Sequence, residues 1–186
     1  MFPLVLDIKT HAIVLSGRGV SLLRRLALLD SAGAANVRVF SDDADVAMAE
    51  KIGARLTNRL AGKSDLNGVK LLFLTGLTES EGAPLAEAAR ALGILVNSED
   101  QPSLCDFHVP AMLRRGDLLL TVSTNGAVPG LAARLREDLA ERFGPEWAER
   151  VDALSIERAK LRAQGTKPAE VRRKLDDIVG TNRWLS

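Results

Sequence analysis

The sequence predicts an α/β fold in which a doubly wound, mostly parallel sheet is followed by a helical region. Five short apolar runs predict strands, and segments of helical periodicity lie between several of them. The runs are nearly all apolar, as strands of a parallel sheet are when helices cover both faces. They lie at 13–15, 37–40, 71–74, 94–96 and 118–122.

Two of the expected connections between strands are amphipathic helices that end at a glycine. The first carries leucines at helical spacing between residues 22 and 29 and ends near Gly33. The second runs from about Pro84 to Leu92 and is stopped by Gly93, immediately before the next strand. A strand, a helix and a second strand within about 30 residues form a βαβ unit, so these strands are expected to be parallel.

The segment after Pro129 shows no strand pattern and carries Leu131, Leu135 and Leu139 at intervals of four. This stripe predicts a helix whose apolar face packs against a second copy of the chain or against another part of its own chain. Pro145 and the stretch 164–168 divide the segment after Pro129 into three helices. We therefore expect an α/β domain over 1–112, a dimerisation region over 113–144 and a C-terminal helical region over 145–186.

Composition and charge argue against several classes of protein. The 186 residues carry 25 Lys and Arg against 24 Asp and Glu, and a net charge of +1 gives no electrostatic basis for binding nucleic acid. The apolar runs fall far short of the roughly 20 residues that span a bilayer, so we expect a cytoplasmic protein without membrane contact. One cysteine and two histidines are too few for a disulfide or a structural zinc or iron–sulfur site, and no resident metal is expected.

Gly17, Arg18 and Gly19 follow the first strand and open the first helix. A phosphate at this junction could accept hydrogen bonds from free backbone N–H groups at the positive end of the helix dipole. The glycines permit a tight turn, but Leu22 stands three residues later, where a small residue favours close packing. The turn is therefore either an incomplete dinucleotide-binding loop or a simple connection from strand to helix.

Acidic residues follow the second and the fourth strand, at the edge where open α/β sheets bind ligands. Asp42, about 20 residues after the glycine turn, is either a ligand of an adenosine ribose or an ordinary loop residue. Asp100, shortly after Asn97, is either a general base or part of a polar turn. Cys105 and His108 stand in surroundings typical of packed residues rather than of a nucleophile and a proton carrier.

The loop Ser123–Gly126 ends the fifth apolar run and is also expected to border the crevice at the edge of the sheet. Arg114 and Arg115 lie shortly before it. They are either a cationic patch that faces an anionic ligand or two solvated surface side chains.

Several motifs together resemble one protein family, that of the siroheme-synthase N-terminal module, precorrin-2 dehydrogenase. Some members of this family are also sirohydrochlorin ferrochelatases. The resemblance covers nearly the whole chain and is most specific from Asn97 to Arg136. The motifs are Phe2-Pro3-Leu4, Ile13-Val14 before Gly17-Arg18-Gly19, Asn97 with Asp100, Cys105-Asp106-Phe107 with Pro110-Ala111, Arg114-Arg115-Gly116-Asp117-Leu118, Ser123-Thr124-Asn125-Gly126, Pro129, Leu131-Ala132-Ala133 and Leu135-Arg136.

The resemblance implies a Rossmann-like domain that binds NAD, and the oxidation of the tetrapyrrole precorrin-2 to sirohydrochlorin by a homodimer built through the helical region. It implies the module without the methyltransferase domain of some relatives. Any ferrochelatase activity, a lyase reaction, would take Fe²⁺ as a substrate. The sequence departs from the family at Arg18, which replaces the middle of three glycines, at Ser21-Leu22 in place of Val-Ala, at Thr75-Gly76 in place of Ala-Thr, and at Val128 in place of a serine.

The expected site has one catalytic residue, Asp100, which matches the functional aspartate of the family. The expected contacts to NAD are Gly17, Arg18, Gly19, Val20, Ser21, Ser41, Asp42, Thr75 and Gly76, and the expected contacts to the tetrapyrrole are Asn97, Ser123, Thr124, Asn125 and Gly126. Two other functions stay open. One is a non-redox tetrapyrrole-binding protein or chelatase with a degenerate nucleotide loop, and the other is a Rossmann-like sensor that binds a nucleotide as a regulatory signal.

Overall fold

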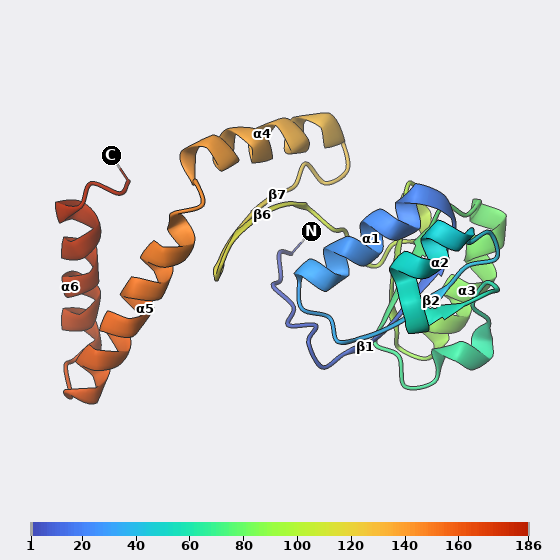
Figure 1. Cartoon of the computed structure of the whole chain (residues 1–186), viewed down its shortest axis with the longest axis horizontal. Helices are drawn as coiled ribbons and strands as arrows, with labels where there is room; N and C mark the ends of the chain where they lie inside the picture. The colour runs from blue at the N-terminus through green and yellow to red at the C-terminus, as the bar shows by residue number, and fades with distance from the viewer. Residues whose placement is uncertain (1, 186) are drawn as a thin grey trace. The chain divides into compact units, whose positions relative to one another are not determined.

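The computed structural model describes residues 2–185 and consists of two compact units, with the division between Val109 and Pro110. The first unit contains the parallel sheet with α1, α2 and α3, and the second contains the β6–β7 hairpin with α4, α5 and α6 (Figure 1). None of the helices formed by residues 2–185 combines the length and the apolar character needed to cross a bilayer.

The sheet of the first unit has five parallel strands in the order β3-β2-β1-β4-β5. The order reverses between β1 and β4, where Gly17 pairs with Thr75, so their ends form the topological switch point. This confirms the doubly wound architecture predicted from the sequence. The strands are β1 (Ala12–Gly17), β2 (Asn36–Phe40), β3 (Leu56–Thr57), β4 (Leu71–Thr75) and β5 (Leu95–Ser98).

Two details of the predicted sheet were wrong. The fifth apolar run forms β7 (Leu118–Val122), which pairs antiparallel with β6 (Ala111–Arg115) in the second unit. Only two residues separate the two strands, and the first of them, Gly116, has φ +54°; this connection is too short for a parallel crossover. The parallel sheet takes its fifth strand from the two-residue β3, which is too short to leave a periodic signal in the sequence.

The helices of the first unit are α1 (Gly19–Ser31), α2 (Val46–Ile52) and α3 (Glu79–Ala91). α3 begins five residues before the predicted start, and Pro84 lies inside it. A capping box explains the earlier start, because the Thr78 side chain accepts from the Glu81 N–H while the Glu81 carboxylate accepts from the Thr78 N–H. Short 3₁₀ turns lie at Gly53–Arg55, Lys63–Leu66 and Pro102–Leu104.

Alternate residues of the central strands enter two separate cores, one on each face of the sheet. Ile13, Leu15 and Phe73 pack with the leucines of α1, whereas Val14 and Leu72 pack with α3. A fully buried leucine or isoleucine contributes roughly 1.5–3 kcal/mol to the free energy of folding. These cores hold β1 and β4 rigidly, so the loops at their carboxyl ends start from fixed positions.

The second unit adds α4 (Pro129–Arg142), α5 (Trp147–Ala163) and α6 (Pro168–Thr181) to the β6–β7 hairpin. α5 and α6 lie side by side (Figure 1). An aromatic cluster centred on Trp147, whose ring centroid is 5.1 Å from that of Phe143 and 6.4 Å from that of Trp184, joins the ends of these helices. The three helices predicted for this region are all present.

Candidate functional site

The turn between β1 and α1 is the centre of the candidate site. β1 ends at Gly17 and α1 begins at Gly19, with Arg18 between them in an extended conformation. Within residues 2–185, no side chain caps α1 at this end and its first turn contains no acidic residue. The Arg18 N–H donates to the Thr75 carbonyl oxygen at 3.0 Å. The positive end of the α1 dipole therefore suits an anion.

The glycines at this edge have separate roles. A Cβ at Gly17 would collide with the carbonyl oxygen and Oγ1 of Thr75, so this glycine permits the close approach of β1 and β4. Gly76, at φ +60°, lies so near the loop that a Cβ would stand 2.7 Å from the Arg18 carbonyl oxygen. At Gly19, φ is +65° and a Cβ would meet no described atom within 4 Å, so space is open above the start of α1.

The Arg18 side chain links three elements across the edge of the sheet. Its Nε and Nη2 donate to Oδ1 and Oδ2 of Asp42, after β2, at 2.7 and 2.9 Å. Its Nη1 donates to Oε1 of Glu81, in the first turn of α3, at 2.7 Å. Both carboxylate oxygens of Asp42, the expected contact to the ribose, are therefore bound by Arg18.

The pKa values of the three groups reflect these contacts. Hydrogen bonds from Arg18 lower the pKa of Asp42. The pKa of Glu81 falls to about 2, first because its carboxylate accepts from the Thr78 backbone and then because it accepts from Arg18. Hydrogen bonds to Asp42 and then to Glu81 raise the pKa of Arg18. All three groups therefore stay charged throughout the physiological range.

The other expected nucleotide contacts lie along the same edge. Ser41 is buried, and its hydroxyl donates to Oδ1 of Asp43 at 2.8 Å, so it supports the loop that carries Asp42. Val20 is exposed and Ser21 is half-buried in the first turn of α1. Thr75 is buried, and its Oγ1 has no hydrogen-bond partner within residues 2–185.

Buried polar atoms without hydrogen-bond partners occur on α1, on β5 and just after β5. Asn97 is 5% exposed, and its Nδ2 donates to the Phe107 carbonyl oxygen at 2.9 Å. Asn97 Oδ1, Glu99 Oε2 and Arg25 Nη1 are all buried and lack partners among the described residues. Arg25 lies over the Phe73 ring, where burial lowers its pKa. Unpaired buried atoms of this kind are costly, so a bound polar ligand would offset their desolvation.

Asp100 is exposed at the end of β5 and has a left-handed backbone with φ 60°. Hydrogen bonds on both sides hold this turn. Ser98 Oγ lies 2.9 Å from Gln101 Oε1, and Gln101 Nε2 donates to a backbone oxygen of the β4–α3 loop at 2.6 Å. Cys105 Sγ accepts from the Ser98 N–H at 3.2 Å, which fits the predicted structural role of the thiol. His108 is exposed rather than packed, contrary to the prediction.

The loop Ser123–Gly126 belongs to the second unit, so it does not follow a strand of the parallel sheet as predicted. Asn125 and Gly126 both have positive φ, at 55° and 80°, which makes a tight turn before α4. Arg115 Nε donates to the Phe143 carbonyl oxygen at 2.9 Å, so this side chain anchors the hairpin to the end of α4. Of the residues expected at the site, only those of the first unit therefore lie along the carboxyl edge of the parallel sheet.

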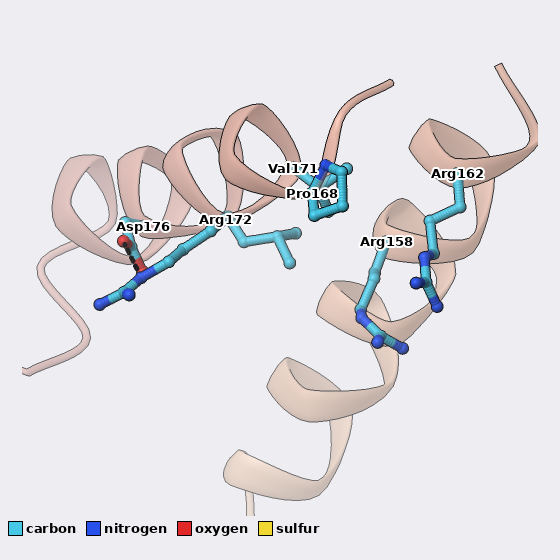
Figure 2. Close-up of a pocket in the computed structure, with 7 residues that line it drawn as sticks. Arg158, Arg162, Pro168, Val171, Arg172 and Asp176 are labelled. Atoms are coloured by element: carbon cyan, nitrogen blue, oxygen red, sulfur yellow. Dashed lines mark ion pairs between the residues drawn. The ribbon is translucent and has the colours of Figure 1, made fainter. Parts of the chain in front are cut away.

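A separate hollow of about 240 Å³ lies between α5 and α6 (Figure 2). Arg158 and Arg162 point into it from α5, and Arg172, from α6, is paired with Asp176 at 3.7 Å. It contains none of the residues expected at the site. Its cationic lining offers no acid–base group other than Asp176, so the carboxyl edge of the sheet is the better candidate.

A parallel sheet with this strand order, a glycine turn at the switch point and an acidic residue after β2 defines a nucleotide-binding protein of the Rossmann type. The chain belongs to the family NAD_binding_7, described as putative NAD(P)-binding, which matches residues 4–111. The match covers the whole sheet and the segment up to β6. It agrees with the NAD cofactor expected from the sequence.

Siroheme synthases are similar to the chain over most of its length. The siroheme synthase of Methylococcus capsulatus is 37% identical over 149 residues, which cover 76% of this chain and 31% of the relative. That of Azotobacter vinelandii is 31% identical over 179 residues, covering 95% of this chain and 36% of the relative. The chain thus spans about a third of the length of these relatives.

The fold is also that of a solved structure, SirC, precorrin-2 dehydrogenase. The two superpose with a TM-score of 0.75 at 23% identity, over 100% of this chain and 93% of that chain. The likeness extends to both units and confirms the predicted order of a Rossmann-like domain followed by a helical region.

The residues at the glycine turn fit a nicotinamide dinucleotide. The space above Gly19 and the uncapped start of α1 suit a pyrophosphate, and Arg18 adds a cation beside it. Asp42 stands where an adenosine ribose would be held, although Arg18 occupies both of its oxygens.

The expected site did not include three charged residues that the structure places near it. Glu81 could have been noticed from the Thr78-x-x-Glu81 capping box, but no local signal shows that it meets Arg18. Arg25 and Glu99 carry no motif at all. Their importance arises from burial without hydrogen-bond partners, which only the tertiary packing reveals.

Proposed function

We propose that the chain is an NAD-dependent dehydrogenase that oxidises precorrin-2 to sirohydrochlorin. The observation that carries the proposal is the match to siroheme synthases over as much as 95% of the chain, together with an open glycine turn at the switch point of the sheet. The structural likeness to a precorrin-2 dehydrogenase supports it. A general nucleotide sensor would not account for similarity that continues through the helical region.

The dinucleotide would be held by the backbone N–H groups of Gly19, Val20 and Ser21 and by Arg18 at the start of α1. Asp42 and the loop supported by Ser41 would hold the adenosine ribose. When bound, this cofactor accepts a hydride. Thr75 and Gly76 contribute the close contact of β4 with the glycine turn, which keeps that turn in place.

The oxidation removes one hydride and one proton from the tetrapyrrole, so a group that accepts the proton is required. Asp100 carries an exposed carboxylate at the carboxyl edge of the sheet, on a backbone held in a left-handed conformation. Backbone conformations of this kind concentrate at functional sites, where the surrounding structure maintains them. We assign to Asp100 the acceptance of the proton, which then passes to solvent.

Asn97 would contribute to tetrapyrrole binding through Oδ1, which is buried and unpaired, while its Nδ2 is fixed by the Phe107 carbonyl oxygen. A ligand N–H group would satisfy this acceptor. The residues Ser123, Thr124, Asn125 and Gly126 are the expected contacts from the second unit. Their turn presents backbone groups of the kind that bind polar substituents.

The proposal includes a homodimer formed through α4, in the region 113–144. Leu131 and Leu135 are 48% and 41% exposed and Leu139 is half-buried, so the apolar stripe predicted from the sequence is partly uncovered in the single chain. Uncovered leucines on one helix face are typical of an interface between identical subunits. Because the reaction would draw on the cellular pool of NAD, the proposal also places the protein in the cytoplasm.

A second candidate function is a tetrapyrrole-binding protein that inserts Fe²⁺ into sirohydrochlorin without redox chemistry. The observation that favours it is the Arg18 side chain, which binds Asp42 and Glu81 across the nucleotide turn. In this reaction Asp100 would accept protons from the pyrrole nitrogens as the metal enters.

The test is the rate of sirohydrochlorin formation from precorrin-2 and NAD, measured with the purified chain. Insertion of Fe²⁺ into supplied sirohydrochlorin is measured separately. Both assays are repeated with Asp100→Ala, and Asp152→Ala, which removes an exposed carboxylate on α5, is the matched control for that variant. Turnover that depends on NAD supports the dehydrogenase. Metal insertion without NAD-dependent turnover would contradict it and favour the second function.

A further inference from the structure

We propose that Arg18 determines which nicotinamide dinucleotide the chain accepts, by masking the carboxylate of Asp42 so that the 2′-phosphate of NADP is not excluded. The inference rests on the proposed function, because it concerns the nucleotide site of the same dehydrogenase. It assigns a specificity role to a residue that stands where the family has a glycine.

The masking is geometric. An acidic residue after β2 selects NAD because its carboxylate accepts from the ribose hydroxyls and repels a 2′-phosphate. Here both Asp42 oxygens already accept a hydrogen bond, since Nε and Nη2 of Arg18 bind Oδ1 and Oδ2 at 2.7 and 2.9 Å, so fewer acceptor sites and less negative charge face a ligand. This two-bond arrangement is the preferred geometry between a guanidinium and a carboxylate, so the pair is well formed.

The masking is also electrostatic. Without Arg18, Asp42 and Glu81 would place two negative charges at this edge, whereas with Arg18 the three groups sum to one negative charge. Side chains of the three residues are 29–40% exposed, so the contacts are partly shielded from solvent but open to a ligand. A phosphate that approaches Asp42 therefore meets a guanidinium beside the carboxylate, which removes most of the repulsion.

The neighbouring arginines are committed elsewhere. Arg59 binds both oxygens of Asp65 at 2.7 and 2.8 Å, and Arg38 donates to the Asp65 backbone oxygen while lying over the Phe40 ring. Neither donates to Asp42 in the described structure. The effect on Asp42 is therefore assigned to Arg18.

The inference predicts three different preferences. The parent chain binds NAD and NADP with dissociation constants within about tenfold of each other. Arg18→Gly, which restores the family glycine and unmasks Asp42, shifts the ratio at least about tenfold towards NAD. Asp42→Asn, which removes the carboxylate charge and releases Nε and Nη2 of Arg18 to bind a phosphate while Nη1 keeps Glu81, shifts the ratio towards NADP.

The experiment measures the dissociation constants of NAD and NADP by titration calorimetry with the full chain and each variant. Arg18→Gln is a second variant that removes the charge but keeps a side chain of similar length. Arg55→Gln is the matched control, because Arg55 makes an equivalent pair with Asp30, at 2.6 and 3.1 Å, on an element away from the turn. The control is expected to leave the ratio unchanged.

The outcomes separate this inference from the proposed function. If the Arg18 variants bind NAD but keep the parental ratio within about twofold, the assignment of specificity to Arg18 is wrong and the dehydrogenase proposal stands. If the parent binds neither dinucleotide at millimolar concentration, the proposed function fails and this inference fails with it. A shift of the ratio in the Arg18 variants and not in Arg55→Gln supports the inference.

Discussion

Replacing Asp100 with glycine and, separately, with alanine should separate catalysis from stability. Both variants remove the carboxylate, so both should lose turnover by about 10²–10⁴, the usual contribution of a general base. Their stabilities should differ, because Asp100 has φ 60° and only glycine adopts this conformation without strain.

The difference in stability follows from two opposing quantities. A left-handed backbone costs a residue with a Cβ roughly 1–2 kcal/mol, which Asp100→Gly relieves and Asp100→Ala does not. Glycine loses roughly 0.5–1 kcal/mol more backbone entropy on folding. The glycine variant should therefore be more stable than the alanine variant by about 0.5–1 kcal/mol.

The assays are sirohydrochlorin formation for turnover and urea denaturation for the free energy of unfolding. Near-parental turnover in both variants would show that Asp100 is a polar turn residue, and the mechanism would lack its base. Equal stabilities of the two variants would show that the turn relaxes when the carboxylate is removed, so that the left-handed backbone is not maintained by its surroundings.

Three further results are expected. Gly17→Ala should destabilise the fold by about 1–3 kcal/mol in urea denaturation, because its Cβ has no space beside the β4 backbone; a change below about 0.5 kcal/mol would contradict this. The hydrogen bond from Arg59 lowers the pKa of Asp65 from 3.8 to about 2, so this pair stabilises the fold above pH 4 and the contribution is lost as the pH falls towards 2. The stability difference between the parent and Arg59→Gln should therefore shrink over that interval, and a constant difference would disprove the linkage. Leu131→Asp should convert a dimer into a monomer in sedimentation, whereas Ile156→Asp, at an exposed position on α5, should not; a monomeric parent would refute the dimer.

Much of the first unit could be predicted because its signals are local. The β1, β2, β4 and β5 strands are apolar runs, and the C-terminal ends of α1 and α3 follow glycine signals within a few residues, whereas α2 was not predicted. The antiparallel hairpin was mistaken for a parallel strand, since an apolar run has the same pattern in either sheet. The start of α3 was misplaced because Pro84 can stand in a helix interior when the capping box earlier in the chain already starts the helix.

The candidate site was predicted in part for the same reason. The glycine turn and Asp42 were located by their distances along the chain from the first strand, which a βαβ unit holds nearly constant. The polar atoms of Arg25, Asn97 and Glu99 could not be found in this way. Whether such an atom is paired depends on which side chains the tertiary packing brings to it, and no spacing in the sequence reports that.

The sequence by itself determined the βαβ organisation, the glycine turn, the acidic residue after β2 and the helical C-terminal region, because each depends on residues close together in the chain. Only the tertiary structure decided what Arg18 does. Its partners Asp42 and Glu81 lie 24 and 63 residues away and are brought to it by the order of the strands. An ion pair depends on distances of a few ångströms between side-chain atoms, and these are set by the packing of β1 between β2 and β4 rather than by any local pattern.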